Sequence, residues 1–272
     1  MTADGALIPG HATRAGTESY SKSFGAALPS AHYSDFLNLH LLAPGYIAQQ
    51  IDETRQAQGV ATLDALLIDQ PEVHILRLGK AELNQRLQRA FAVCEQAVKE
   101  NKIRCYGISS FNGFRVETDH ALFQSLASLQ GLAEKAAQIT HQDERAKHSF
   151  KLVQLPFNQA TPEGFTRFNQ ATGQGNVGST IQSAFQLKVY VMASYGLAKG
   201  RLARECVDSL RRALPQFAND AQRALQFNRS TPGLGTRLAG ISSPAHLDDL
   251  LAVARTPPMA KADYLRLYER VE

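Results

Sequence analysis

The sequence predicts an α/β fold built from parallel βαβ units. From about residue 46 onward, short apolar runs alternate with longer amphipathic segments, which is typical of strands joined by crossover helices. The chain has 272 residues, of which 44% are hydrophobic and 20% charged, enough for a large domain with a buried core. No apolar run approaches the ~18 uncharged residues of a membrane-spanning helix.

The first half of the chain contains three predicted strands. The segment 45–59 is expected to be a helix ending at Gly59, and the apolar run 63–68 a buried strand. The clearest helix is 80–100, because its apolar residues fall on one stripe and its charges lie opposite. That stripe consists of Leu83, Leu87, Phe91, Cys94 and Val98. The next elements are a strand at 102–109, a helical region at about 119–138 and a strand at 150–157.

The second half repeats the alternation and brings the number of predicted strands after residue 60 to five. The dipeptide Ser243-Pro244 is typical of an N-cap followed by a first-turn proline, and it opens a helix that runs to about Ala254. The remaining elements are a helix at 179–187, a strand at 188–194, helices at about 200–213 and 217–228, a strand at 236–242 and a helix from Lys261.

Residues 1–40 differ from the rest of the chain in composition. They are rich in Gly, Ala, Ser and His and have no long apolar period, although 38–42 (NLHLL) is compatible with one short strand. We therefore expect an extended N-terminal arm over 1–40 and a folded domain over 41–272.

The overall charge and the cysteines exclude several classes of protein. The formal net charge is +4, and the Lys and Arg residues are spread along the chain without a basic block, so nucleic acid is not favoured as a partner. The three cysteines, Cys94, Cys105 and Cys206, form no CxxC pair, which favours a reducing compartment and argues against zinc or disulfides. The histidines form no HxH or HExxH pattern, so no metal site is predicted. His246 is expected on a helix surface and His74 in a loop.

A glycine motif and two basic pairs have simple structural interpretations. Residues 173–178 (GQGNVG) match G-x-G-x-x-G, but the polar segment before them resembles a helix, whereas a dinucleotide site needs a strand there. We interpret the motif as a loop, with Ser179 capping the following helix. The basic pairs are expected on solvated helix faces; they are Arg201/Arg204 and Arg211/Arg212.

Five phrases of the sequence together resemble the aldo-keto reductases, and their order and spacing agree with that family over about residues 41–260. The resemblance implies a (β/α)8 TIM barrel that uses NADP(H) to reduce carbonyl groups. The phrases are LDALLIDQPE (63–72), AVKENKIRCYGISSFNG (97–113), LVQLPFN (152–158), VYVMASYGLAKGRL (189–202) and ALQFNRSTPGLGTRLAGISSPAHLDDLL (224–251).

The length of the N-terminal part indicates that this barrel is incomplete. Residues 10–24 resemble a leader that precedes the barrel in one subgroup, and the family's barrel has three βα units before the strand at 63–68. A βαβ unit takes roughly 30 residues, but only about fifteen separate Phe24 from His40. We therefore expect an incomplete, aldo-keto reductase-like (β/α)8 barrel over 41–272 in which the first βα units are missing.

The resemblance also implies that the catalytic tetrad is absent. In the family a Tyr donates the proton, a Lys paired with an Asp lowers its pKa, and a His orients the carbonyl. The first three come from the missing segment, and Asp69 stands at the His position, where a carboxylate would repel the developing alkoxide. Tyr20, Lys22 and Tyr33 lie on the arm, where no strand would hold them rigidly enough to substitute. Asp69 is therefore interpreted as a strand-end or loop-capping residue.

The positions that bind cofactor in the family are only partly retained. Ser109 and Gln154 match groups that hold the nicotinamide carboxamide, and Ser110 stands where the family usually has Asn. At the adenosine end, Ser242 replaces a basic residue and Leu250 replaces an Asn. The matches to the pyrophosphate loop are Ser194, Leu197 and Gly200. We interpret these positions as vestigial and expect no cofactor, with NADP(H) as the alternative.

The predicted function is that of a degenerate reductase serving as an accessory or structural subunit of a larger assembly. An open barrel leaves unpaired strand edges, which proteins cover, so other protein subunits are the expected partners. The mild basicity and the frequent reuse of enzyme folds in such complexes favour the mitochondrion, with the cytoplasm as the other location. Two alternatives stay open: a carbonyl oxidoreductase completed by the arm or a partner, and a non-catalytic NADP(H) sensor.

Overall fold

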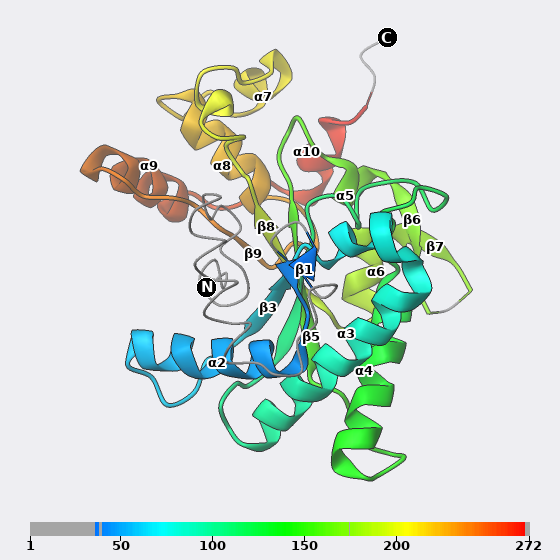
Figure 1. Cartoon of the computed structure of the whole chain (residues 1–272). Coiled ribbons are helices and arrows are strands. Elements are labelled where there is room, and N and C mark those ends of the chain that lie inside the picture. The colour runs from blue at the N-terminus through cyan, green and yellow to red at the C-terminus, as the bar shows by residue number, and fades with distance from the viewer. Residues whose placement is uncertain (1–35, 38–39, 174, 270–272) are drawn as a thin grey trace.

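The structure is a computed structural model that describes residues 36–37, 40–173 and 175–269 (Figure 1). Most of the predicted arm lies outside these residues. Its described end forms a short antiparallel ribbon of β1 (Phe36–Leu37) and β2 (His40–Leu41). The strand expected within 38–42 therefore corresponds to β2.

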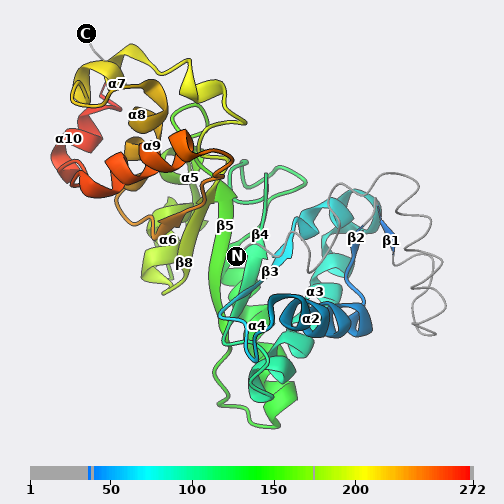
Figure 2. The ribbon, with the colours of Figure 1, turned by 90° about the vertical axis from the view of Figure 1, so that its left-hand side faces the viewer.

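The centre of the molecule is a five-stranded sheet in which every neighbouring pair is parallel. Figures 1 and 2 show the strands side by side with helices around them. The strands, in their order across the sheet, are β3 (Leu66–Asp69), β4 (Tyr106–Ser109), β5 (Phe150–Pro156), β8 (Tyr190–Ser194) and β9 (Thr236–Arg237). These are the five strands that the sequence predicts, although β9 is much shorter than the predicted 236–242.

The sheet order follows the chain order, as in a (β/α) barrel that is not closed. β3 and β9 stand at its two ends, and within the described part of the chain no further strand pairs with either of them. A full TIM barrel has eight such strands. The prediction of an incomplete (β/α)8 barrel is therefore confirmed.

Three helices form the outer layer beside β3, β4 and β5 (Figure 2). They are α2 (Pro44–Gln58), α3 (Ile75–Lys99) and α4 (Leu126–His141). α2 ends at Gly59, as predicted, in the left-handed conformation (φ 64°) that glycine adopts without steric cost. α4 lies further along the chain than the predicted 119–138, because Ser125 caps its start by accepting from the Ser128 amide.

The segment between β3 and α3 is helical rather than a loop. Residues Pro71–His74 form the 3-10 helix η2, which runs directly into α3. At Gly79 the backbone leaves the helical region (φ 74°, ψ 168°), so α3 is two helical pieces joined at a kink. His74, predicted in a loop, is fully buried within η2. Pro71 at the first position of η2 favours this helical turn, because its fixed φ suits the start of a helix.

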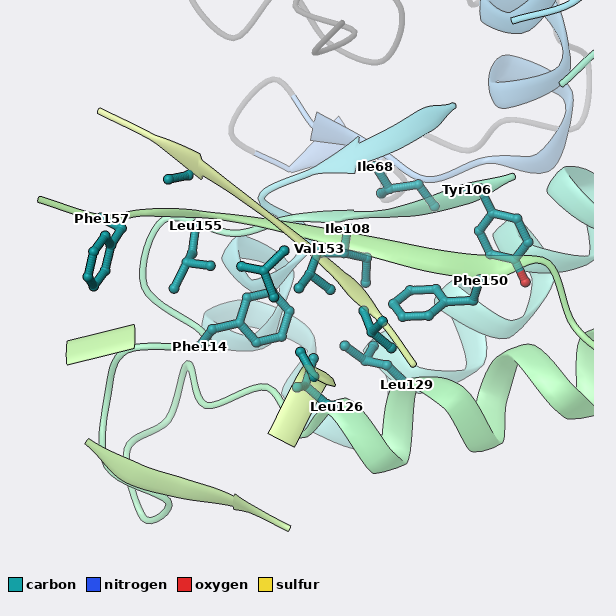
Figure 3. Close-up of a cluster of buried hydrophobic side chains, with 14 of the residues drawn as sticks. Ile68, Tyr106, Ile108, Phe114, Leu126, Leu129, Phe150, Val153, Leu155 and Phe157 are labelled. Atoms are coloured by element: carbon teal, nitrogen blue, oxygen red, sulfur yellow. The ribbon is translucent and has the colours of Figure 1, made fainter. Parts of the chain in front are cut away.

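The main core lies between the sheet and its helices (Figure 3). Side chains alternate across a strand, so Ile68, Tyr106 and Ile108 face the helices and are fully buried. Phe91 of α3 packs against Tyr106, with ring centroids 5.2 Å apart. Leu126 and Leu129 of α4 close the same cluster. The residues between these positions face the opposite side of the sheet, which is the inner side of a barrel.

The glycine motif at 173–178 belongs to a hairpin. After α5 (Glu163–Thr166), β6 (Phe168–Ala171) pairs antiparallel with β7 (Val177–Ser179). The segment read as helix-like thus contains a strand. That strand is outside the parallel sheet, and the last glycine of the motif lies inside β7, so the hairpin is not a dinucleotide cradle. Ser179 caps α6 (Thr180–Gln186) by accepting from the Gln182 amide, as predicted.

The C-terminal third forms a separate group of helices beside β8 and β9 (Figures 1 and 2). The helix predicted at 200–213 is broken, because the chain turns at Arg204–Val207 between two short helices. Ser243 caps the following helix with Pro244 at its first position, as predicted. The elements are η3 (Arg201–Ala203), α7 (Asp208–Ala213), α8 (Asp220–Arg229), α9 (Pro244–Arg255) and α10 (Lys261–Arg266).

Candidate functional site

The predicted site residues of three strands lie in one row across the sheet. Asp69 of β3 is in register with Ser109 of β4, Ser109 with Gln154 of β5, and Gln154 with Met192 of β8. Since these residues are opposite one another, they share the inner side of the sheet near its carboxyl end. This is the end at which parallel barrels carry their active sites. The fold thus places Asp69, Ser109 and Gln154 side by side, and their role stays a prediction.

Gln154 and Ser109 are buried and bonded to each other. The Gln154 Nε2 donates to Ser109 Oγ at 3.1 Å, and the two side chains are 6% and 7% exposed. Gln154 Oε1 has no hydrogen-bond partner within the described part of the chain. A buried acceptor without a donor is costly, so this oxygen is the polar group in the row that a ligand amide could satisfy.

Asp69 ends β3 and is only half buried. Its Oδ2 accepts from the side chain of Gln70 at 3.1 Å, and Gln70 adopts a left-handed backbone (φ 42°) as the chain turns into η2. The Gln70 amide also donates to the Ser109 carbonyl at 2.6 Å. Asp69 therefore lies at a strand end where the following backbone is held by a hydrogen bond to β4. Since it is acceptor-only when ionised, it cannot donate to a carbonyl substrate as a histidine does.

A buried acid, Glu72, lies behind this row and was missed in the sequence. Its Oε1 accepts from Ser110 Oγ at 2.6 Å and from the amides of Phe111 and Asn112 at 3.1 and 3.3 Å. Burial raises the pKa of Glu72, and the nearby Asp69 adds to this, although the hydrogen bonds from Ser110, from the Asn112 amide and from its own backbone act in the opposite direction. Glu72 is 2% exposed.

Ser110, which stands where the family usually has Asn, is therefore engaged with the protein itself. It donates to Glu72 and accepts from the Gly113 amide at 2.8 Å. The pair fixes the loop after β4 to η2. The sequence signal for Glu72 was its position directly after Pro71, which fits a buried 3-10 turn as well as a loop.

The loop after β8 uses its own amides internally. Ala198 N donates to Tyr195 O, Gly200 N to Leu197 O, and Leu202 N to Leu197 O, at 2.9–3.2 Å. Ser194 lies at the end of β8 and its carbonyl accepts from the Phe157 amide. A pyrophosphate cradle needs amides that point at the ligand. Four of the five amides at 198–202 instead donate to carbonyls within the loop, the fourth being Arg201 N to Ala198 O at 3.3 Å. Gly200 adopts φ 90° there.

The adenosine end is likewise occupied by contacts within the chain. Ser242 Oγ lies 3.0 Å from Nδ1 of His246, on the exposed start of α9, so His246 is on a helix surface as predicted. Leu250 packs against the main core. Of the NADP(H)-binding groups that the family implies, the residues at the carboxamide end fit, whereas those at the pyrophosphate and adenosine ends do not.

The other predicted residues do not add a second centre. Tyr20, Lys22 and Tyr33 lie outside the described residues. Across the described ranges, no three His, Cys, Asp or Glu side chains gather closely enough to hold a metal ion, and no helix is long and apolar enough to cross a membrane. The three cysteines are free thiols. Of the basic pairs, Arg201 contacts Glu205 and Arg211 contacts Asp208 and Asp220, all at the surface.

Comparison with known proteins supports the fold. The sequence matches no protein-family description and no curated protein. Among solved structures, an aldo-keto reductase from Klebsiella pneumoniae in complex with NADP and acetate is 18% identical (TM-score 0.54), with 82% of this chain covering 65% of that one. An aldo-keto reductase from Bacillus halodurans, in its holo form, is 15% identical (TM-score 0.53), with coverages of 86% and 67%.

A thermostable aldo-keto reductase in complex with the inhibitor epalrestat gives a similar match: 14% identity, TM-score 0.54, and coverages of 83% and 66%. This chain thus spans about two thirds of the length of the reductases it matches. Such low identities concern the fold rather than the chemistry. The chain has the fold of the aldo-keto reductases, in the form of an incomplete (β/α)8 barrel.

Proposed function

We propose that this protein is a non-catalytic accessory subunit of a larger protein assembly, built on a degenerate aldo-keto reductase fold. The observation that carries the proposal is the five-stranded parallel sheet with an end strand on each side, β3 and β9, that no other described strand pairs. Strand edges of this kind pair readily with other chains unless they are covered. Partner subunits that cover these edges would complete the barrel.

The chemistry of the row supports a role without catalysis. Asp69, at the family's histidine position, is an acceptor at the turn into η2. Ser110 is bonded to Glu72, and the amides of the loop at 198–202 are bonded within that loop. These groups stabilise the carboxyl end of the sheet itself rather than present donors to a substrate.

The experiment that tests the proposal is the native mass of the untagged protein in extract from its own cells, by native gel or gradient. We expect migration only in a large particle, because a subunit with two open edges is stabilised by its partners. Migration as a monomer or small oligomer would contradict the proposal. So would NADPH-dependent carbonyl reduction by the purified protein, which would favour an oxidoreductase completed by the arm or by a partner.

The proposal includes the mitochondrion as the location of this assembly, supported by the mildly basic charge of +4 and the reuse of enzyme folds in mitochondrial complexes. Cell fractionation followed by detection of the untagged protein tests this part separately. Recovery in the cytosolic fraction would contradict the mitochondrial location without contradicting the subunit role.

A second candidate is NADP(H) binding without turnover, and the buried Gln154 Oε1 favours it. That oxygen has no partner among the described residues and lies beside Ser109, at the position that corresponds to the carboxamide site. NADPH titration followed by nucleotide fluorescence distinguishes the candidates. Saturable binding that is lost in Gln154→Ala, but kept in the surface variant Gln96→Ala, would support the sensor role; absence of binding would eliminate it.

A further inference from the structure

A small cavity lies where the end of α8 meets the segment leading into β9; these two elements can be followed in Figure 1. Its volume is about 280 Å³, just below the ~300–1,000 Å³ of pockets for drug-sized ligands. The residues that line it are Asn228, Arg229, Leu234, Gly235, Thr236 and Arg237. Two arginines therefore border a space that suits a small ligand.

The two arginines of this cavity are held by carbonyl oxygens and not by acids. Arg237 donates to the Leu225 carbonyl, and Arg229 to the carbonyls of Thr256 and Ala254. Within the described ranges, no carboxylate lies at ion-pair distance from either guanidinium. A guanidinium has five N–H donors and stays charged in proteins, so most of these donors and both charges remain to be satisfied.

Burial makes this arrangement costly. Arg237 is half buried, and desolvation followed by repulsion from Arg229 lowers its pKa to about 10. The group is still protonated at neutral pH. Two like charges beside one another in a partly desolvated space are unfavourable unless an anion neutralises them. The chain keeps this pair on α8 and β9 without supplying that anion from the described residues.

Asn228 also lines the cavity, but its amide atoms lie beneath the cavity surface. The residue is fully buried, and neither Nδ2 nor Oδ1 has a hydrogen-bond partner among the described residues. This amide is therefore closed off from a ligand, and the two arginines are the charged groups that could hold one.

We propose that this cavity is a binding site for a phosphate group, held by the guanidinium groups of Arg229 and Arg237. Arginine matches the oxygens of phosphate with paired, charge-assisted hydrogen bonds. The site lies between α8 and the end strand, away from the Asp69–Gln154 row, and it does not depend on the proposed subunit role. Its ligand is either inorganic phosphate or a small phosphomonoester.

Phosphate binding by the purified full-length chain tests the proposal. Isothermal titration at pH 7.5 with sodium phosphate, glycerol phosphate and acetate, at constant ionic strength, compares a free phosphate, a phosphomonoester and a carboxylate. We expect saturable binding of at least one of the two phosphate compounds and weaker binding of acetate. If both phosphate compounds bind no better than acetate, the proposal is wrong.

Single substitutions locate the site. Arg237→Gln and Arg229→Gln should each weaken phosphate binding about tenfold or more, because each removes a charge-assisted contact. Arg104→Gln, which changes an exposed arginine paired with Asp64, should leave binding unchanged. Binding that survives in both cavity variants would place the phosphate elsewhere and overturn the assignment.

One further variant keeps the test decisive if a glutamine variant fails to fold. Arg237→Lys retains the charge but loses the planar fork, so it should fold and still bind phosphate more weakly than the wild type. Unchanged phosphate binding in Arg237→Lys would contradict the site.

Discussion

At the scale of single residues, the buried acids should affect the stability of the fold more than the residues aligned across the sheet do. Glu72 binds three donors of the loop after β4, and yet burial raises its pKa. Desolvation thus outweighs the hydrogen bonds. The native state holds this proton more tightly than the unfolded chain, whose glutamates titrate near 4.5.

This raised pKa predicts a pH dependence of stability that Glu72→Gln should remove. The contribution of Glu72 is fully present below pH 4.5 and is lost as the pH rises through its native pKa. The wild-type free energy of unfolding should therefore fall, relative to that of Glu72→Gln, between pH 4.5 and neutrality. Urea unfolding of both proteins at several pH values measures the difference. A constant difference over this range would contradict the assignment.

A second buried acid supports a prediction about Tyr106. Glu95 is fully buried and accepts from the Tyr106 hydroxyl at 2.8 Å and from the Ser149 amide at 2.7 Å. Burial, with the nearby Glu95, raises the pKa of Tyr106, so the phenol remains a donor at all ordinary pH values.

Tyr106→Phe should lower the free energy of unfolding by ~1–3 kcal/mol, because it removes one of the two donors to a buried oxygen of Glu95. Tyr190→Phe is the matched control. Its hydroxyl donates to Thr236 Oγ1 at 2.9 Å, but the residue is 49% exposed, so water can replace the bond and the effect should stay within ~0.5 kcal/mol. Urea unfolding compares the two variants. Equal losses of unfolding free energy would mean that the buried hydrogen bond to Glu95 contributes no more to stability than an exposed one.

At the scale of elements, the sequence predicted those features that depend only on residues close to one another along the chain. The caps at Ser179 and Ser243 and the glycine stop at Gly59 are all where the sequence places them. These features depend on hydrogen bonds and backbone conformations within a few residues. The apolar runs of β3, β4, β5 and β8 were visible because each contains fully buried apolar residues, whereas both residues of β9 are only half buried.

The sequence failed where distant residues decide the outcome. The predicted helix at 200–213 is broken between η3 and α7, where the Cys206 amide donates to Asp220 of α8 at 3.4 Å. Residues 168–171 form a strand that pairs with β7. In the site, strand ends were predictable from apolar runs, and their alignment followed from parallel pairing. The burial of Glu72 was not, because it depends on amides about 40 residues away along the chain.

The kink in α3 provides a prediction at this scale. Gly79 has φ 74° and ψ 168°, a conformation that only glycine adopts at low cost. Gly79→Ala should destabilise the protein by ~1–3 kcal/mol. In Gly131, inside α4, an added Cβ would meet no atom within 4 Å, so Gly131→Ala should stabilise it by ~0.5–1 kcal/mol. Thermal unfolding of both variants tests whether the two changes in stability have opposite signs. Stabilisation by both would mean that α3 is continuous in solution.

At the scale of the whole molecule, the open sheet determines which strands are secure. β5 pairs with β4 on one side and β8 on the other, whereas β3 and β9 each have a single partner strand among the described residues. An amide that is bonded and flanked on both sides exchanges only when a large part of the protein opens. The two end strands therefore define where the isolated chain differs from an assembled one.

Hydrogen exchange measured by mass spectrometry should show this gradient. In the isolated full-length chain, peptides covering 150–156 should exchange slowest, and peptides covering 66–69 and 236–237 should exchange faster, because one side of each end strand is unpaired. In the native particle, partner strands would slow the end strands selectively and leave β5 unchanged. End strands that are as protected as β5 in the isolated chain would mean that the chain covers its own edges, and the accessory-subunit proposal would lose its physical basis.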